Sequence, residues 1–408
     1  SSPCGDGTGG KGDVADSIPS VIPLQMRASV PPYSPTILPE DGKLLPQENL
    51  SVLDSLLEIK LFKYPVPSEG GYYRIDIIPK KKHGFAPFKK DIIFCIDVSG
   101  SISRDKLDEF KQGVGNSISK LNPDDRFEII AFRQKSYPLF GRFASPLPEN
   151  FQKAESFLFK LTKTGSTNIF GALEPFAGDK DPYISKGRPR LLFLASDGQV
   201  NTGEVVDSRE LINTFSNMNQ ESTSLFAFST GKGANAFLLD LLAYRNRGQS
   251  ISSPDIQKSA DVLTKFINDV SKICVMNLDY QITGELADLA FPKKLPHLYE
   301  NHTLSIYGAY PELTNLIGLR ITGTDSSGKK QELIYKADLS KAEDAGPELP
   351  KTWALNYIFH LYSRLIVVEN DVNMRLQIHN IAKKFGIELP YLDSYLISKR
   401  KQYLNQNR

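Results

Sequence analysis

Apolar residues change their spacing twice along the chain. From Leu56 to Ile78, and again after Met276, apolar and polar residues alternate and are interrupted by turn residues such as Gly, Pro and Ser. This period of two is typical of half-buried antiparallel strands. Between these regions, continuous apolar runs such as 92–98 alternate with segments in which apolar residues recur every three or four positions. The central pattern predicts strands buried on both faces and connected by helices, as in a mostly parallel α/β sheet.

The central region, residues 89–274, contains enough of these segments to predict a doubly wound sheet. Its first helix is expected to begin after Ser103 as N-cap, and its apolar face consists of Leu107, Phe110, Val114, Ile118 and Leu121. Further strands are expected at 126–132, 190–195 and 224–229. Helices are expected at 151–161, 208–218, 236–246 and 256–273.

The segments before and after the central region share the same alternation of apolar and polar residues. We therefore expect a single antiparallel β-sandwich interrupted by the α/β domain. Two amphipathic helices follow, and Gly386 is the expected C-cap of the second. Trp353 and its aromatic neighbours are interpreted as helix packing. The predicted parts are a flexible leader, the first sandwich strands, the α/β domain, the remaining strands and the C-terminal helices, at residues 1–50, 51–88, 89–274, 275–345 and 346–408.

The composition of the chain excludes several classes of protein but does not identify a partner. The 49 basic and 47 acidic residues give a net charge of +2, so no global field favours nucleic acid or an anionic membrane. No apolar run approaches the roughly 20 residues that span a bilayer. Three cysteines exclude a disulfide scaffold: Cys95 is expected in the core, and Cys4 and Cys274 could pair only by accident of the fold. The basic segment 80–90 is expected to be solvated.

Polar side chains with oxygen atoms follow three of the predicted central segments. Asp97, Ser99 and Ser101 come directly after the first buried strand, Thr167 precedes a helix, and Asp197 follows the strand at 190–195. Ligands of doubly wound sheets bind outside the carboxyl ends of the strands, where these residues are expected. Oxygen ligands suit Mg²⁺, Mn²⁺ or Ca²⁺ and argue against zinc or copper. Each Asp alone could cap a helix, but the five residues together predict a divalent cation, with Mg²⁺ the first choice.

The segments DVSGSIS, TGSTNI and SDG, with the five residues just named, resemble the metal-ion-dependent adhesion site of von Willebrand factor A domains. The resemblance implies a von Willebrand A-like sheet and direct coordination of the metal by Ser99, Ser101 and Thr167. It also implies that Asp97 and Asp197 act directly or through water, and that the ion keeps a position open for an acidic residue of a protein partner.

Residues 55–398 also resemble the heavy chains of inter-alpha-trypsin inhibitor and their bacterial relatives, through stretches such as YYRIDIIP, SDGQVNTGE and FGIELPYLDSYLI. This resemblance implies an extracellular, cell-surface or periplasmic location. Two departures are expected: the vault-type N-terminal domain of these proteins is replaced by the leader, and no DPHF stretch follows the helices. The covalent glycosaminoglycan linkage of the animal proteins is therefore not expected here.

Three classes of function remain open at this point. The first and preferred class is a non-enzymatic, adhesion-type binding module whose metal bridges to an acidic residue of a protein partner. The second is a structural or assembly component of a cell-envelope or extracellular complex, in which the metal is a stability clip. The third is an enzyme that uses the metal as a Lewis acid. No His or Glu is visibly paired with the cluster as a general base, which disfavours the enzyme.

Overall fold

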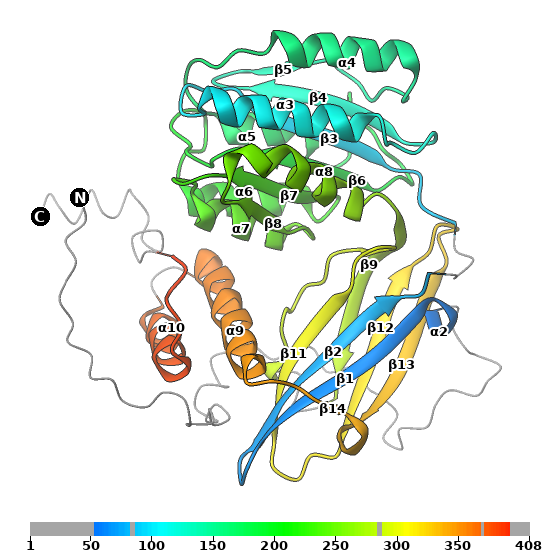
Figure 1. The fold of residues 1–408 in the computed structure, drawn as a ribbon, viewed down its shortest axis with the longest axis vertical. Helices are drawn as coiled ribbons and strands as arrows, with labels where there is room; N and C mark the ends of the chain where they lie inside the picture. The colour runs from blue at the N-terminus through cyan, green and yellow to red at the C-terminus, as the bar shows by residue number, and fades with distance from the viewer. Residues whose placement is uncertain (1–52, 82–85, 284–287, 369–370, 392–408) are drawn as a thin grey trace, which may run out of the picture.

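The computed structural model describes residues 53–81, 86–283, 288–368 and 371–391 (Figure 1). The expected leader at 1–50, including Cys4, lies outside the described residues, as do residues 392–408 of the C-terminal region. Figure 1 shows three parts: an α/β domain at the top, a β-sandwich below it, and two C-terminal helices beside both. Within the described residues, no helix is long and apolar enough to span a bilayer.

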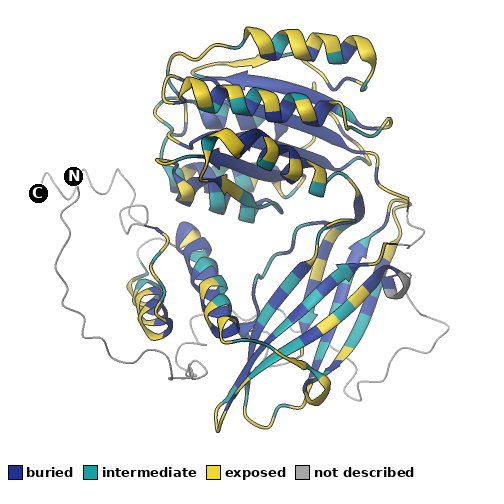
Figure 2. Ribbon diagram, viewed as in Figure 1, coloured by how far each residue is buried: buried dark blue, intermediate teal, exposed yellow. Residues whose placement is uncertain are grey.

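The α/β domain is built on a six-stranded sheet in the order β5-β4-β3-β6-β7-β8. All neighbouring strands are parallel except β5, which pairs antiparallel with β4. The strands are β3 (Asp91–Asp97), β4 (Arg126–Phe132), β5 (Ser136–Pro138), β6 (Arg190–Ala195), β7 (Thr223–Thr230) and β8 (Ser250–Ser253). Figure 2 shows the central strands as almost wholly buried, which explains their unbroken apolar runs.

Helices cover both faces of this sheet, and alternate strand residues serve two separate cores. Phe94 belongs to the core beneath the first group of helices, whereas its neighbour Cys95 faces the core beneath the second group. The first group is α3 (Arg104–Ile118), α4 (Pro148–Lys160) and α8 (Ser259–Asp269). The second group is α5 (Ile169–Leu173), α6 (Ser208–Asn219) and α7 (Ala236–Arg245). Ser103 caps α3 through its side chain, as predicted.

Two four-stranded sheets form the sandwich, in the orders β11-β2-β1-β14 and β10-β9-β12-β13. All pairings are antiparallel except the short one between β1 and β14. Strands β1 (Leu57–Val66) and β2 (Gly70–Pro79) precede the α/β domain. The strands that follow it are β9 (Ile273–Ile282), β10 (Leu298–Tyr299), β11 (Leu304–Pro311), β12 (Leu316–Thr324), β13 (Lys330–Asp338) and β14 (Glu343–Asp344). The predicted fold class, an α/β domain inserted in a sandwich, is therefore confirmed.

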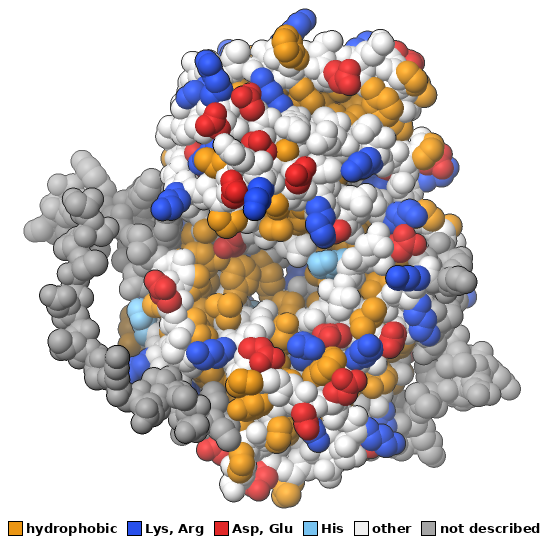
Figure 3. Space-filling view, in the orientation of Figure 1, with side chains coloured by type: hydrophobic (Ala, Val, Ile, Leu, Met, Phe, Trp, Pro, Cys, Tyr) orange, Lys and Arg blue, Asp and Glu red, His pale blue; other side chains and the backbone are white. Residues whose placement is uncertain are grey.

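Helix α9 (Glu348–Val367) packs against both other parts of the molecule, and α10 (Val372–Phe385) packs against α9. Trp353 is fully buried in α9 and its indole N–H donates to the Leu289 carbonyl oxygen at 2.8 Å, so its packing role is confirmed. Gly386 ends α10 in the left-handed conformation expected of a C-cap, at φ 61°. Figure 3 shows a hollow lined by hydrophobic side chains where these helices meet the domain and the sandwich.

A second contact joins α9 to the α/β domain through polar groups. The buried Arg209 of α6 donates to the carbonyl oxygens of Leu365 and Ile366 at 2.8 and 3.1 Å. Asn213, one turn further along α6, donates to the Ile366 oxygen at 2.7 Å. These carbonyls belong to the last turn of α9 and have no partner within the helix, so α6 acts as its C-terminal cap.

Two sequence expectations need correction. The basic segment 80–90 is not uniformly solvated: Lys90 is 1% exposed because its ammonium pairs with Asp125 at 2.7 Å. The strands β5 and β8 were missed. Both are short and carry no run of apolar residues, since they lie at the two edges of the sheet. The buried residues Cys95 and Cys274 are free thiols.

Candidate functional site

The candidate site lies at the carboxyl end of the sheet, where the strand order reverses. β3 is the first strand of the domain and is flanked by β4 on one side and β6 on the other. The chain therefore moves outward in both directions from β3, and the loops after β3 and β6 lead away from each other. Doubly wound sheets bind ligands between such loops, and we call this region the crevice. The register aligns Ile96 with Ala195, so Asp97 and Ser196 leave their strands side by side.

Asp97 is the most deeply held residue of the site, with no exposed surface. Its Oδ1 accepts a hydrogen bond from the Ser99 backbone N–H at 2.9 Å, and its Oδ2 accepts one from the Ser196 hydroxyl at 2.6 Å. Burial raises the pKa of the Asp97 carboxyl above its usual range, the hydrogen bonds oppose the rise, and the nearby negative charge of Asp197 adds to it. The ionised carboxylate would therefore gain from a cation close by.

Ser99 and Ser101 project from the turn between β3 and α3. Their hydroxyl oxygens lie 3.1 Å apart, within hydrogen-bond distance. Ser99 is fully buried, whereas Ser101 is exposed. The pair thus leads from the interior of the crevice to the solvent.

The loop that carries Thr167 is tied to the loop after β3 by backbone hydrogen bonds. The Gly100 N–H donates to the Gly165 oxygen at 2.8 Å, and the Thr164 N–H donates to the Val98 oxygen at 2.9 Å. Thr167 itself is fully buried, and its backbone N–H donates to Asn201 Oδ1 at 2.7 Å. Its hydroxyl oxygen Oγ1 is buried and has no hydrogen-bond partner among the residues that the structure describes. Such an unpaired group costs about 1–3 kcal/mol, so it calls for an explanation.

Asp197 is fixed at the start of the loop after β6 and is 7% exposed. Its Oδ1 accepts from the Gln199 N–H at 3.0 Å, and its backbone oxygen accepts from the Asn235 N–H at 2.7 Å. Its Oδ2 accepts no hydrogen bond from the described residues. The carboxylate of Asp197 is close enough to influence the pKa of Asp97, so the two acids share the crevice.

Two residues that support the site were missed from the sequence. Ser196 orients Asp97 and also accepts from the Gly198 N–H at 3.0 Å. Asn201 joins the loop after β6 to Thr167. Ser196 stands directly before Asp197, and Asn201 lies in the same polar segment, so their positions were visible, but their partners are 99 and 34 residues away.

The donor set consists of two carboxylates and three hydroxyls. Among the described residues, no group of three or more His, Cys, Asp or Glu side chains is placed to hold a metal ion. A cation bound here would therefore depend on the hydroxyl oxygens, one of which, Thr167 Oγ1, lacks a partner within the protein. Hard cations such as Mg²⁺ fit this all-oxygen set, and softer metals do not.

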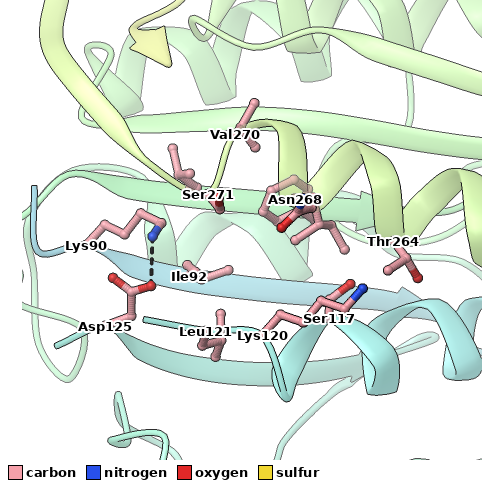
Figure 4. A pocket seen from close by; sticks show the side chains of 13 residues that line it. Lys90, Ile92, Ser117, Lys120, Leu121, Asp125, Thr264, Asn268, Val270 and Ser271 are labelled. Carbon is pink, nitrogen blue, oxygen red and sulfur yellow. Dashed lines mark hydrogen bonds and ion pairs between the residues drawn. The ribbon is translucent and has the colours of Figure 1, made fainter. Parts of the chain in front are cut away.

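A cavity lies at the other end of the strands, where β3 and β4 begin (Figure 4). It has a volume of about 20 Å³ and lies between α3, α8 and the sheet. The buried ion pair of Lys90 and Asp125 forms one wall, and Ile92, Leu191 and Phe193 are among the apolar lining residues. None of the five predicted site residues lines it, so it is separate from the crevice.

Comparisons with known proteins agree with this architecture. Residues 91–267 match the family described as von Willebrand factor type A domain. The inter-alpha-trypsin inhibitor heavy chain H2 of Sus scrofa is 25% identical over 83% of this chain and 38% of its own length. Heavy chain H4 of Homo sapiens is 23% identical over 80% of this chain and 35% of its own length. The chain therefore spans little more than a third of the curated relatives it matches.

A solved structure extends the likeness beyond the α/β domain. The von Willebrand factor type A protein from Catenulispora acidiphila has a TM-score of 0.53 and 10% sequence identity, and the match covers 84% of this chain and 89% of that one. At this identity the likeness shows the fold alone. Von Willebrand factor type A domains generally mediate protein–protein interaction. Residues 91–267 of this chain form a von Willebrand factor type A domain, and the chain as a whole is similar in sequence to the inter-alpha-trypsin inhibitor heavy chains.

Proposed function

We propose that this protein is a metal-dependent, adhesion-type binding module without enzymatic activity. A divalent cation, Mg²⁺ before Mn²⁺ or Ca²⁺, is held by Asp97, Ser99, Ser101, Thr167 and Asp197. The ion keeps one coordination position open, and that position accepts an acidic side chain of a protein partner. The resemblance to the heavy chains supports an extracellular, cell-surface or periplasmic location for this activity.

The observation that carries the proposal is the unpaired hydroxyl of Thr167. This oxygen is fully buried in a loop that is hydrogen bonded to the loop after β3, yet no group of the described residues donates to it or accepts from it. A cation would use its free lone pairs and offset the cost of burying them. The same cation would also favour the ionised form of Asp97, whose pKa burial raises.

The charges and the exposure of the donors support an open coordination position. Mg²⁺ prefers six ligands, and five side chains leave a sixth position for water or for a carboxylate. The exposed Ser101 lies on the solvent side of the set, whereas Asp97, Ser99 and Thr167 have no exposed surface. A partner therefore has access from the side of Ser101.

Metal binding is tested with Mn²⁺, which electron paramagnetic resonance detects when it is free. Thr167→Ala should weaken Mn²⁺ binding at least about tenfold, because a coordinating oxygen is lost. The matched control is Thr164→Ala, the same change at an exposed position of the same loop, which should bind Mn²⁺ as the parent does. Equal affinity in the parent and Thr167→Ala would refute the site.

Recognition of a carboxylate is tested with a fluorescein-labelled peptide that contains one Glu in a Gly/Ser background. Its fluorescence anisotropy should rise with protein concentration in MgCl₂ and not in EDTA. If Mg²⁺ raises the melting temperature while the peptide is bound equally in both buffers, the metal is a stability clip. The assembly role would then replace the adhesion role.

A further inference from the structure

Basic residues are frequent in the loops that carry or contact the proposed metal site. Five segments either carry a site residue or are hydrogen bonded to a loop that does: 97–106, 133–135, 161–168, 196–205 and 231–235. Besides Asp97 and Asp197, they contain two acidic residues, Asp105 and Glu204. Against these stand six basic residues, which we call the basic rim: Arg104, Lys106, Arg133, Lys135, Lys163 and Lys232. Because the whole chain has 49 basic and 47 acidic residues, this excess is local to the loops around the site.

No member of the basic rim forms an ion pair within the part of the chain that the structure describes. Three basic residues elsewhere in the same domain do have acidic partners: Lys90 pairs with Asp125, and Arg126 and Arg188 both pair with Asp91. Two carboxylates around a divalent cation are formally neutral. The positive charge of the rim is therefore not balanced by the filled metal site.

Contacts with the backbone hold several of these cations in place around the crevice. The Lys163 ammonium donates to the Gly100 oxygen at 3.1 Å, directly beside Ser101. On another side, the Lys106 ammonium donates to the Lys232 oxygen at 3.2 Å, which brings two rim members together.

The turn after β4 supplies a third group of rim residues. The Asn168 N–H, next to Thr167, donates to the Arg133 oxygen at 3.0 Å. The Arg133 guanidinium lies over the ring of Tyr137, 4.8 Å from its centroid, and Tyr137 is 39% exposed. The rim thus combines fixed cations with an exposed aromatic surface.

Resting on the proposed function, we propose that the partner segment bound at this site carries several acidic residues rather than one. One carboxylate fills the open position of the metal, and flanking Asp or Glu side chains lie against the basic rim. The exposed ring of Tyr137 offers an apolar contact to the same segment, which favours an acidic peptide over a purely charged polysaccharide. The rim raises the association rate and selects acidic sequences.

The test compares two fluorescein-labelled nonapeptides: the single-Glu peptide above, and one with Glu at five of the nine positions. In MgCl₂ with 50 mM NaCl, the Glu-rich peptide should bind at least about tenfold more tightly, and the advantage should shrink in 500 mM NaCl because the rim charges are exposed. Equal affinities of the two peptides, or no detectable binding of either, would overturn the proposal.

The rim itself is tested by the triple variant Arg104→Gln, Lys135→Gln and Lys232→Gln, whose residues are exposed. The matched control removes the same charge from exposed lysines at the opposite edge of the sheet: Lys89→Gln, Lys120→Gln and Lys186→Gln. The rim variant should lose about tenfold in affinity for the Glu-rich peptide and keep the Mn²⁺ affinity of the parent. The control variant should keep both affinities, and equal losses in the two variants would contradict a local role.

Three outcomes separate this inference from the proposed function. If the Glu-rich peptide binds equally in MgCl₂ and EDTA but depends on the rim, the metal bridge fails and the rim stands as an anion-binding surface. If the single-Glu peptide needs Mg²⁺ and the rim variant changes nothing, the metal bridge stands and the rim proposal fails. If a heparin fragment displaces the Glu-rich peptide and depends on the rim in EDTA, the ligand is a polysaccharide and the peptide proposal is wrong.

Discussion

Replacing His360 by Phe should reduce the acid sensitivity of the fold. His360 lies on α9 and is 8% exposed, and neither ring nitrogen has a hydrogen-bond partner in the part of the chain that the structure describes. Burial lowers the pKa of its imidazole from 6.5 to about 3, and the positive charges of Lys293 and Arg364 add to this effect. The folded protein therefore keeps His360 neutral at pH 5.5, whereas the unfolded chain takes up a proton there.

The size of the effect follows from the protonation of the unfolded state. For an unfolded pKa of 6.5, proton uptake stabilises the unfolded chain by about 1.4 kcal/mol at pH 5.5 and by less than about 0.1 kcal/mol at pH 7.5. The folded state gains almost nothing because its pKa is far lower. His360 therefore removes about 1.4 kcal/mol of stability as the pH falls from 7.5 to 5.5, and His360→Phe should abolish this loss.

Urea unfolding of the parent and of His360→Phe at the two pH values measures this difference. All other titrating groups are shared, including His297, whose pKa burial lowers to about 3. At pH 7.5 the variant should be at least as stable as the parent. Phe leaves no unpaired nitrogen and retains the ring contact with Phe291, whose centroid is 5.4 Å away. An unchanged pH dependence, or a variant less stable by more than about 2 kcal/mol at pH 7.5, would refute the reasoning.

Three further changes test other contacts of the fold. Lys90→Met should cost about 3–5 kcal/mol in urea unfolding because it leaves Asp125 buried without its cation, and adding Asp125→Asn should recover part of the loss. Arg209→Met should cost about 2–4 kcal/mol and increase hydrogen exchange in the last turn of α9, whose carbonyls it caps; unchanged exchange there would contradict the capping role. Gly248→Ala should cost about 3 kcal/mol in thermal unfolding, since its Cβ would overlap the Leu225 oxygen, and an unaltered melting temperature would show that the chain can shift there.

The fold was predictable because the spacing of apolar residues differs between the α/β domain and the sandwich. Strands buried on both faces give unbroken apolar runs, as in β3, and half-buried strands alternate, as in β12. The insertion of the α/β domain could be inferred because the alternating style resumes after it. The edge strands β5 and β8 lack such a signal since their side chains are largely exposed. The sequence pattern therefore predicted the strands that are buried and missed the strands that are exposed.

The location of the candidate residues was predictable for a similar reason, because parallel strands end at one edge of a sheet. Contacts between distant segments carried no such signal. Lys90 and Asp125 are 35 residues apart and look like ordinary surface charges in the sequence, yet they form a buried pair. Arg209 reaches the Leu365 oxygen across 156 residues. A periodic pattern shows which face of a helix or strand is buried. It does not show which polar groups from distant segments contact that face.

The charges of the site and of its surroundings have opposite consequences for a partner. In the proposed site, a pair of acids with three neutral hydroxyls would hold a divalent cation without surplus negative charge, so the ion would attract a further carboxylate. Around it, the six cations of the basic rim, which form no ion pair with the described residues, add a field of the same sign. Coordination to the metal requires one carboxylate, whereas the field of the basic rim attracts several. Experiments can separate the two interactions, because chelation of the metal removes the first and salt weakens the second.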